Sequence, residues 1–110
     1  MNRDLYKKEF LSVLKSIEDT MILKSEEYST NNNPFHNFEA SVGFHKNGTS
    51  KKGLWGMLVK HLISIKDFCE DTVSIGQDQL EEKVKDIVIY TILLSLMNKS
   101  EIDELDKTEL

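Results

Sequence analysis

The chain has 110 residues, of which 39% are hydrophobic and 30% are charged, and its formal net charge at neutral pH is -5. This length fits one domain with a modest core, and this composition excludes a wholly disordered chain. The negative charge argues against a protein that coats duplex DNA or RNA, because that kind of binding neutralises phosphates along a basic face. A small anionic ligand stays compatible with the charge, since it needs only a few local donors.

The cysteine content and the apolar segments bear on the compartment. Cys69 is the only cysteine, so neither a disulfide framework nor a cysteine-rich metal site is available. The segment "MNRDLYKKEF" has charges where a signal peptide needs an apolar run, and the longest apolar segment, "IVIYTILLSLM", is too short to span a bilayer. We therefore expect a cytoplasmic protein with no membrane contact.

The first predicted element is a long amphipathic helix over residues 4–28. Its apolar residues recur at the three- and four-residue spacing of one helical face, at Leu5, Phe10, Leu14, Ile17 and Met21. The same face continues into Lys24 and Tyr28, so a cation and a phenol follow the apolar stripe.

The next segment, "YSTNNNPFHNF", combines a turn-forming asparagine run with aromatic residues. Asn33 before Pro34 predicts a helix N-cap, followed by a short helix over residues 34–44. Two roles stay open for this turn. It places Asn37 and Phe38 beside a ligand, or its phenylalanines close the end of a helical core. The polar segment "HKNGTSKKG" then predicts a loop.

The third predicted helix starts between Ser50 and Leu54 and runs to about Glu70. Its inner stripe comprises Leu54, Leu58, His61, Leu62, Ile65 and either Phe68 or Cys69. The segment "SIGQD" breaks it. Lys51 and Lys52 stand near its start, where the helix dipole disfavours cations, so they are either solvated or hold an anion.

The fourth predicted helix begins with Asp78 and Glu81 at capping-box spacing and runs to Asn98. From Ile87 onward it is apolar on every side, more than three partner helices can cover, so we expect it to help form a subunit interface in a homo-oligomer. Residues 99–110 are an acidic tail or a short helix. The fold class is therefore all-α, a bundle of four to five helices, with residues 1–98 as a single helical domain.

Three polar residues interrupt the apolar stripes, namely Lys24, His61 and Asp86. Buried charge is costly unless it is paired. One interpretation is a satisfied network in which Lys24 pairs with Asp86 and His61 bonds a carbonyl. The other is a ligand pocket beside the asparagine-rich turn.

The segments "KSEEYSTNNNPFHNF", "LVKHLISIKDF" and "EEKVKDIVIYTILL" together resemble a group of small, mostly phage-encoded proteins. This group is related to the MazG-like and dimeric dUTPase-like all-α NTP pyrophosphohydrolases. The shared features are Lys-x-x-x-Tyr, an Asn-Phe pair shortly after a proline, a lysine on the middle helix, and an aspartate four residues before a tyrosine on the last helix. The resemblance covers residues 24–94 and implies a MazG-like, homo-oligomeric bundle, located in the host cytosol if the chain is phage-encoded.

Carried over residue by residue, the resemblance implies a nucleotide-sized pocket. Its lining would be Lys24, Glu27, Tyr28, Asn37, Phe38, Lys60, His61, Asp86 and Tyr90. Such a set provides an aromatic face for a base, amides for the edge of the base, and lysines for phosphate.

The larger superfamily holds Mg²⁺ with two helical pairs of acids, because a hard cation takes several carboxylate oxygens. Here Lys24 stands three residues before Glu27, where the first acid is expected, and Glu82 lies four residues before Asp86 instead of three. We therefore expect binding without turnover and without a cofactor. The ligand would be a nucleotide, or a cyclic or ADP-ribose-derived nucleotide, and the protein would sequester this defence signal. Two alternatives stay open. One is a Mg²⁺-dependent pyrophosphohydrolase that uses Glu26, Glu27, Glu82 and Asp86, and the other is a small host-interaction protein.

Overall fold

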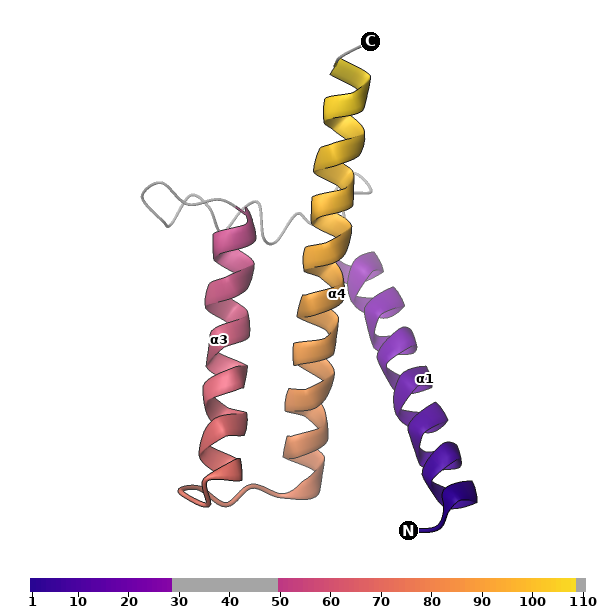
Figure 1. Cartoon of the computed structure of the whole chain (residues 1–110), viewed down its shortest axis with the longest axis vertical. Helices are drawn as coiled ribbons and strands as arrows, with labels where there is room; N and C mark the ends of the chain where they lie inside the picture. The colour runs from indigo at the N-terminus through magenta and orange to yellow at the C-terminus, as the bar shows by residue number, and fades with distance from the viewer. Residues whose placement is uncertain (29–49, 109–110) are drawn as a thin grey trace. The chain divides into compact units, whose positions relative to one another are not determined.

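The structure is a computed structural model that describes residues 1–28 and 50–108. These ranges contain three α-helices and no strand, so the all-α prediction is confirmed for them. The helices are α1 (Arg3–Tyr28), α3 (Ser50–Cys69) and α4 (Gln77–Thr108), shown in Figure 1. The short helix expected over residues 34–44 lies outside the described residues.

The chain divides into two compact units, Met1–His36 and Asn37–Leu110. The first unit contains α1 and the second contains α3 and α4, and each is described by itself. The prediction of a single helical domain over residues 1–98 stays a prediction. Within the described ranges, no helix is long and apolar enough to cross a lipid bilayer.

Helix α1 begins with a side-chain cap that the sequence analysis did not anticipate. The backbone N–H of Leu5 donates to Oδ1 of Asn2 at 2.8 Å, and the N–H of Tyr6 donates to the backbone oxygen of Asn2 at 2.9 Å. Asn2 thus satisfies one of the N–H groups that the first helical turn leaves without an intrahelical partner. The helix predicted over residues 4–28 is confirmed, with its start one residue earlier.

Helix α3 ends in a Schellman motif. The N–H of Asp71 donates to the carbonyl of Phe68 at 3.1 Å, and the N–H of Thr72 donates to the carbonyl of Asp67 at 3.0 Å. Asp71 adopts the left-handed conformation, with φ at 59°, which aspartate tolerates better than most residues but less well than glycine. The chain therefore leaves α3 in a defined direction toward α4.

Helices α3 and α4 form an antiparallel hairpin (Figure 1). An apolar stripe on each helix faces the other helix. The buried residues of this seam are Leu54 and Leu58 on α3, and Ile89 and Met97 on α4. All four lie away from the connection, toward the end of the hairpin where α3 begins. There Nζ of Lys51 lies 3.0 Å from Oε2 of Glu101, so an ion pair also joins the two helices at that end.

One residue expected on the inner stripe of α3, Leu62, is 38% exposed and is not part of it. Of the two alternatives at the end of the stripe, Phe68 is partly buried and Cys69 is exposed. Leu62 lies at the edge of the stripe, where α4 covers a narrower strip of α3 than the apolar pattern marks.

Helix α4 also differs from its predicted limits. It starts at Gln77, so Asp78 lies inside the first turn and is not the N-cap of a capping box. It continues to Thr108, past the end expected at Asn98. The physical reason is that residues 99–108 contain neither glycine nor proline and are rich in good helix formers. In Figure 1, α4 accordingly extends beyond the level at which α3 begins.

Candidate functional site

The central feature of the α3–α4 seam is a histidine that faces a carboxylate. His61 follows Leu58 on the inner stripe of α3, and Asp86 precedes Ile89 on that of α4. The Nε2 atom of His61 lies 3.7 Å from Oδ2 of Asp86, and the two side chains are 25% and 19% exposed. This separation exceeds hydrogen-bond range, so the contact is electrostatic and becomes attractive when the imidazole is protonated.

Tyr90 joins this pair from the next turn of α4. Its ring centroid lies 5.6 Å from that of His61, and the two ring planes are tilted by 33°. Burial, and to a smaller extent the negative charge of Asp86, raise the pKa of the Tyr90 phenol above its ordinary value. The phenol therefore keeps its proton at neutral pH. We call His61, Asp86 and Tyr90 the polar cluster.

Lys60 is exposed on α3 immediately before His61. Its backbone carbonyl accepts a hydrogen bond from Oγ of Ser64 at 3.1 Å. The ammonium group of Lys60 is therefore accessible to an anion in solvent, next to the cluster in sequence but outside the seam.

The structure brings together three of the nine residues expected to line a pocket, namely His61, Asp86 and Tyr90. The others are not placed at the cluster. Asn37 and Phe38 lie outside the described residues, and so do the side chains of Lys24, Glu27 and Tyr28 on the last turns of α1. The expected pairing of Lys24 with Asp86 thus stays a prediction. Among the described residues no hydrogen bond from His61 to a carbonyl is present, and the carboxylate of Asp86 faces the imidazole.

Each member of the polar cluster was predicted as a site residue, but the pairing of His61 with Asp86 was not. A usable signal was present. His61 lies eight residues before the end of α3 and Asp86 lies nine residues after the start of α4. Antiparallel helices joined by a short connection bring residues at equal distances from that connection to the same level, because both helices rise by about 1.5 Å per residue.

The lysines at the start of α3 do not form an open anion site. The charge of Lys51 is offset by Glu101 on α4, and Lys52 also has an interaction partner. The anion-binding interpretation of these residues is therefore not supported.

The side chains of three of the four acidic residues that the hydrolase alternative would use lie within the described part of the chain, namely Glu26, Glu82 and Asp86. Glu82 is exposed one turn before Asp86, and Glu26 is exposed near the end of α1. Within residues 1–28 and 50–108, no group of three or more His, Cys, Asp or Glu residues is arranged to hold a metal ion.

The polar cluster has the chemistry to recognise a small aromatic anion. The Tyr90 and His61 rings offer π-surface for stacking, and a protonated His61 offers a cation for phosphate. The Asp86 carboxylate can accept N–H groups from the edge of a base.

No family model matches the chain, and no curated protein or solved structure matches it either. The resemblance to the MazG-like group therefore rests on the three sequence segments quoted above.

Proposed function

We propose that this chain binds a phosphorylated, nucleotide-type molecule at the polar cluster and sequesters it without turnover. The ligand class includes linear nucleotides and cyclic or ADP-ribose-derived nucleotides. The resemblance to phage-encoded proteins favours a defence signal as the natural ligand, so that the protein acts as a sponge in a host cell.

One observation carries the proposal. A histidine, an aspartate and a tyrosine lie together in a seam whose other inner residues are apolar, and the His61 and Asp86 side chains still reach solvent. Packing alone gives no reason for this choice, because polar groups are costly to bury and an apolar residue would fill the same space. A recognition role explains why the cluster is polar and why it stays partly open.

Each residue has a distinct role in this proposal. Tyr90 and His61 stack against the base, and Asp86 holds the imidazole in place and accepts from the base edge. Lys60 contributes a mobile cation for phosphate from the exposed side of α3. The resemblance also implies Lys24, Asn37 and Phe38 as ligand contacts, and their role stays a prediction.

Binding without turnover is favoured over metal-dependent hydrolysis by the surroundings of Asp86. A pyrophosphohydrolase would need this carboxylate as a Mg²⁺ ligand, together with Glu82 one turn earlier. The imidazole of His61 faces the same carboxylate, and a protonated imidazole competes with a metal ion for it. The lysine at position 24, where the larger superfamily has an acid, also favours direct phosphate contact over metal binding.

The test is calorimetric titration of the full chain with nucleoside triphosphates, cyclic dinucleotides and ADP-ribose-derived nucleotides, each with Mg²⁺ and with EDTA. We expect at least one ligand to bind equally well in both conditions and to be recovered intact. Lys60→Ala should weaken binding roughly tenfold or more, because a charge-assisted contact contributes about 1.5 to 3 kcal/mol. Lys66→Ala is the matched control, since Lys66 lies on another side of α3 and its ammonium pairs with Glu70 at 3.0 Å.

Each failure has its own meaning. Mg²⁺-dependent product release beyond one turnover per chain, abolished by Asp86→Asn, would establish the hydrolase alternative. Binding that Lys66→Ala weakens as much as Lys60→Ala does would reduce the role of Lys60 to general charge. Absence of binding to every ligand would refute the proposal and leave a host-interaction protein.

A further inference from the structure

Helix α1 carries an apolar stripe that is only partly covered. Its members repeat at alternating four- and three-residue steps, the spacing of a coiled-coil seam, at Tyr6, Phe10, Val13 and Ile17, with Leu14 beside them. Ile17 is buried, whereas Tyr6 is 63% and Phe10 is 50% exposed, and Val13 and Leu14 are exposed as well. We call these five residues the α1 apolar stripe.

At the exposed end of the stripe, two aromatic rings stack on each other. The rings of Tyr6 and Phe10 stack with centroids 6.3 Å apart and planes 3° apart. Two adjacent aromatic rings in this arrangement offer a broad apolar face, and aromatic residues of this kind dominate the energetics of many protein interfaces.

The charges of α1 are distributed unevenly along its length. The first half has the cations Arg3, Lys7, Lys8 and Lys15 against the acids Asp4 and Glu9, whereas the second half has the acids Glu18, Asp19, Glu26 and Glu27 against Lys24. A helix is normally stabilised by acids near its N-terminus and cations near its C-terminus. The overall charge of α1 therefore runs against its own dipole.

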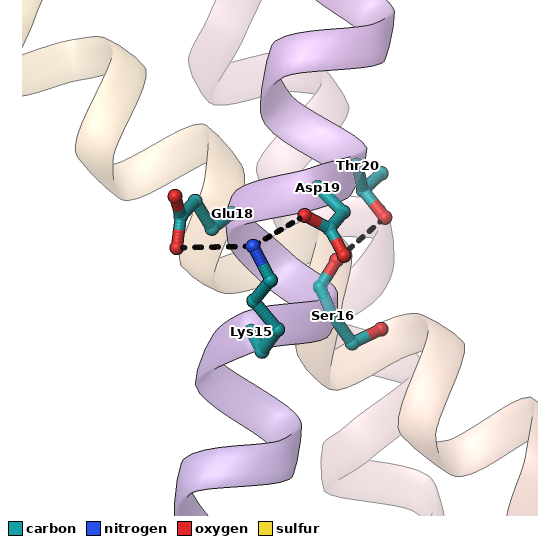
Figure 2. A network of polar contacts seen from close by, with 5 residues as sticks. All are labelled: Lys15, Ser16, Glu18, Asp19 and Thr20. Atoms are coloured by element: carbon teal, nitrogen blue, oxygen red, sulfur yellow. Dashed lines mark hydrogen bonds and ion pairs between the residues drawn. The ribbon is translucent and has the colours of Figure 1, made fainter.

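The ion pairs inside α1 offset only part of this unfavourable charge distribution. Nζ of Lys15 lies 3.1 Å from Oδ1 of Asp19 and 4.0 Å from Oε2 of Glu18 (Figure 2). These contacts, first the hydrogen bond to Asp19, raise the pKa of Lys15. One lysine thus serves two carboxylates, and it precedes them along the helix, which is the less favourable order.

From these two features we propose that α1 is a self-association surface that pairs antiparallel with α1 of a second copy of the chain. This pairing buries the α1 apolar stripe and places each basic half beside the acidic half of the partner helix. A parallel pairing would place like charges side by side. The interface is isologous, so that the same residues contribute from both copies.

The pairing makes a specific ionic contact. Lys7 and Glu18 are eleven residues apart, about three helical turns, and so lie along the same edge of the stripe. In an antiparallel pair related by a twofold axis, each edge meets the same edge of the partner. We assign the register in which Lys7 faces the partner's Glu18, so that the contact occurs twice in each dimer.

The proposed subunit interface lies on α1, whereas the apolar pattern of the sequence predicted it on the last helix, α4. On α4, Leu96 and Ile102 are 46% and 49% exposed, close to the 50% of Phe10. The uneven charge along α1, which an antiparallel copy offsets, is what favours α1 as the contact surface.

The first test is sedimentation velocity of the full chain over a range of micromolar concentrations. We expect a reversible dimer whose dissociation constant rises roughly tenfold or more in Phe10→Gln, because a central aromatic anchor is lost. Leu23→Gln is the matched control. Leu23 is 54% exposed on the same helix but lies on another side of it, so its substitution should leave the dimer unchanged.

The second test uses charge reversal and detects antiparallel pairing directly. Lys7→Glu and Glu18→Lys should each weaken the dimer, because each brings like charges together twice. A mixture of the two variants should form heterodimers as readily as the parent forms homodimers, since both contacts are then opposite in charge again. The double variant in one chain should also dimerise.

A parent chain that stays monomeric at the highest concentration would overturn the proposal. So would a mixture that associates no better than either variant alone, or a Leu23→Gln variant that dissociates as readily as Phe10→Gln. A monomeric parent that Phe10→Gln destabilises would show that the α1 apolar stripe is covered within its own chain.

Discussion

The rotational setting of α3 can be tested with two leucines that flank His61. Leu58 is 5% exposed and Leu62 is 38% exposed, although the apolar pattern assigns both to the inner stripe. Leu58→Ala removes a buried side chain and leaves a cavity, and the two effects together should cost about 3 kcal/mol of unfolding free energy. Leu62→Ala should cost about 1 kcal/mol, because the side chain is only partly covered and the space it leaves is open to solvent.

The measurement is urea unfolding followed by far-ultraviolet circular dichroism. The protein concentration must be equal in all samples, because self-association would add to the apparent stability. With a slope of about 2 kcal/mol per molar urea, the midpoints of the two variants should differ by about 1 M. Equal losses for the two variants would mean that α3 is rotated toward Leu62. In that case His61 would not face Asp86, and the polar cluster would lose its basis.

Three further outcomes follow from the described contacts. The raised pKa of Tyr90 means that the folded chain holds the phenol proton more tightly than the unfolded chain. The contribution of this proton to folding stability is therefore fully present below about pH 10 and is lost as pH rises through the folded pKa. In thermal melts, the Tyr90→Phe variant should lose less stability at alkaline pH than the parent. Asp71→Gly should stabilise the chain by about 0.5 kcal/mol in urea unfolding, because glycine adopts the left-handed conformation of that residue without strain, and a loss of stability would contradict the assigned cap. A double-mutant cycle on Lys51 and Glu101 should give a coupling of about 0.2 to 1 kcal/mol that shrinks with added salt, since both side chains are about half exposed.

The helices themselves were largely predictable from local pattern. Apolar spacing located both ends of α1 and the end of α3 to within one residue, because helical periodicity is written directly into the sequence, whereas the start of α3 was predicted only as the range from Ser50 to Leu54. The end of α4 was not found, since the expected boundary at Asn98 relied on the end of the apolar run. Helix formation needs good helix formers and the absence of breakers, and both conditions persist as far as Thr108.

The candidate site was predictable as a set of residues but not as a set of contacts. His61 and Asp86 stood out because they interrupt apolar stripes, and that signal is local. Their pairing depends on the register of two helices, which is set by the Schellman turn after α3 and by the packing of Leu54 and Leu58 against α4. Neither of these is visible in a periodicity, so the sequence named His61 and Asp86 without pairing them with each other.

The two proposals make independent demands on the chain, because the residues that carry them belong to different helices. His61, Asp86 and Tyr90 all come from the α3–α4 hairpin of a single chain, whereas the self-association surface belongs to α1. If each hairpin holds its own ligand, Phe10→Gln should dissociate the dimer and leave ligand affinity and a stoichiometry of one ligand per chain unchanged. Loss of binding together with loss of the dimer, in a variant that keeps its helical content, would instead show that the site needs residues from both copies. Titrating the same ligand into Phe10→Gln and into Leu23→Gln separates these cases, because the second variant changes the surface of α1 without touching the α1 apolar stripe.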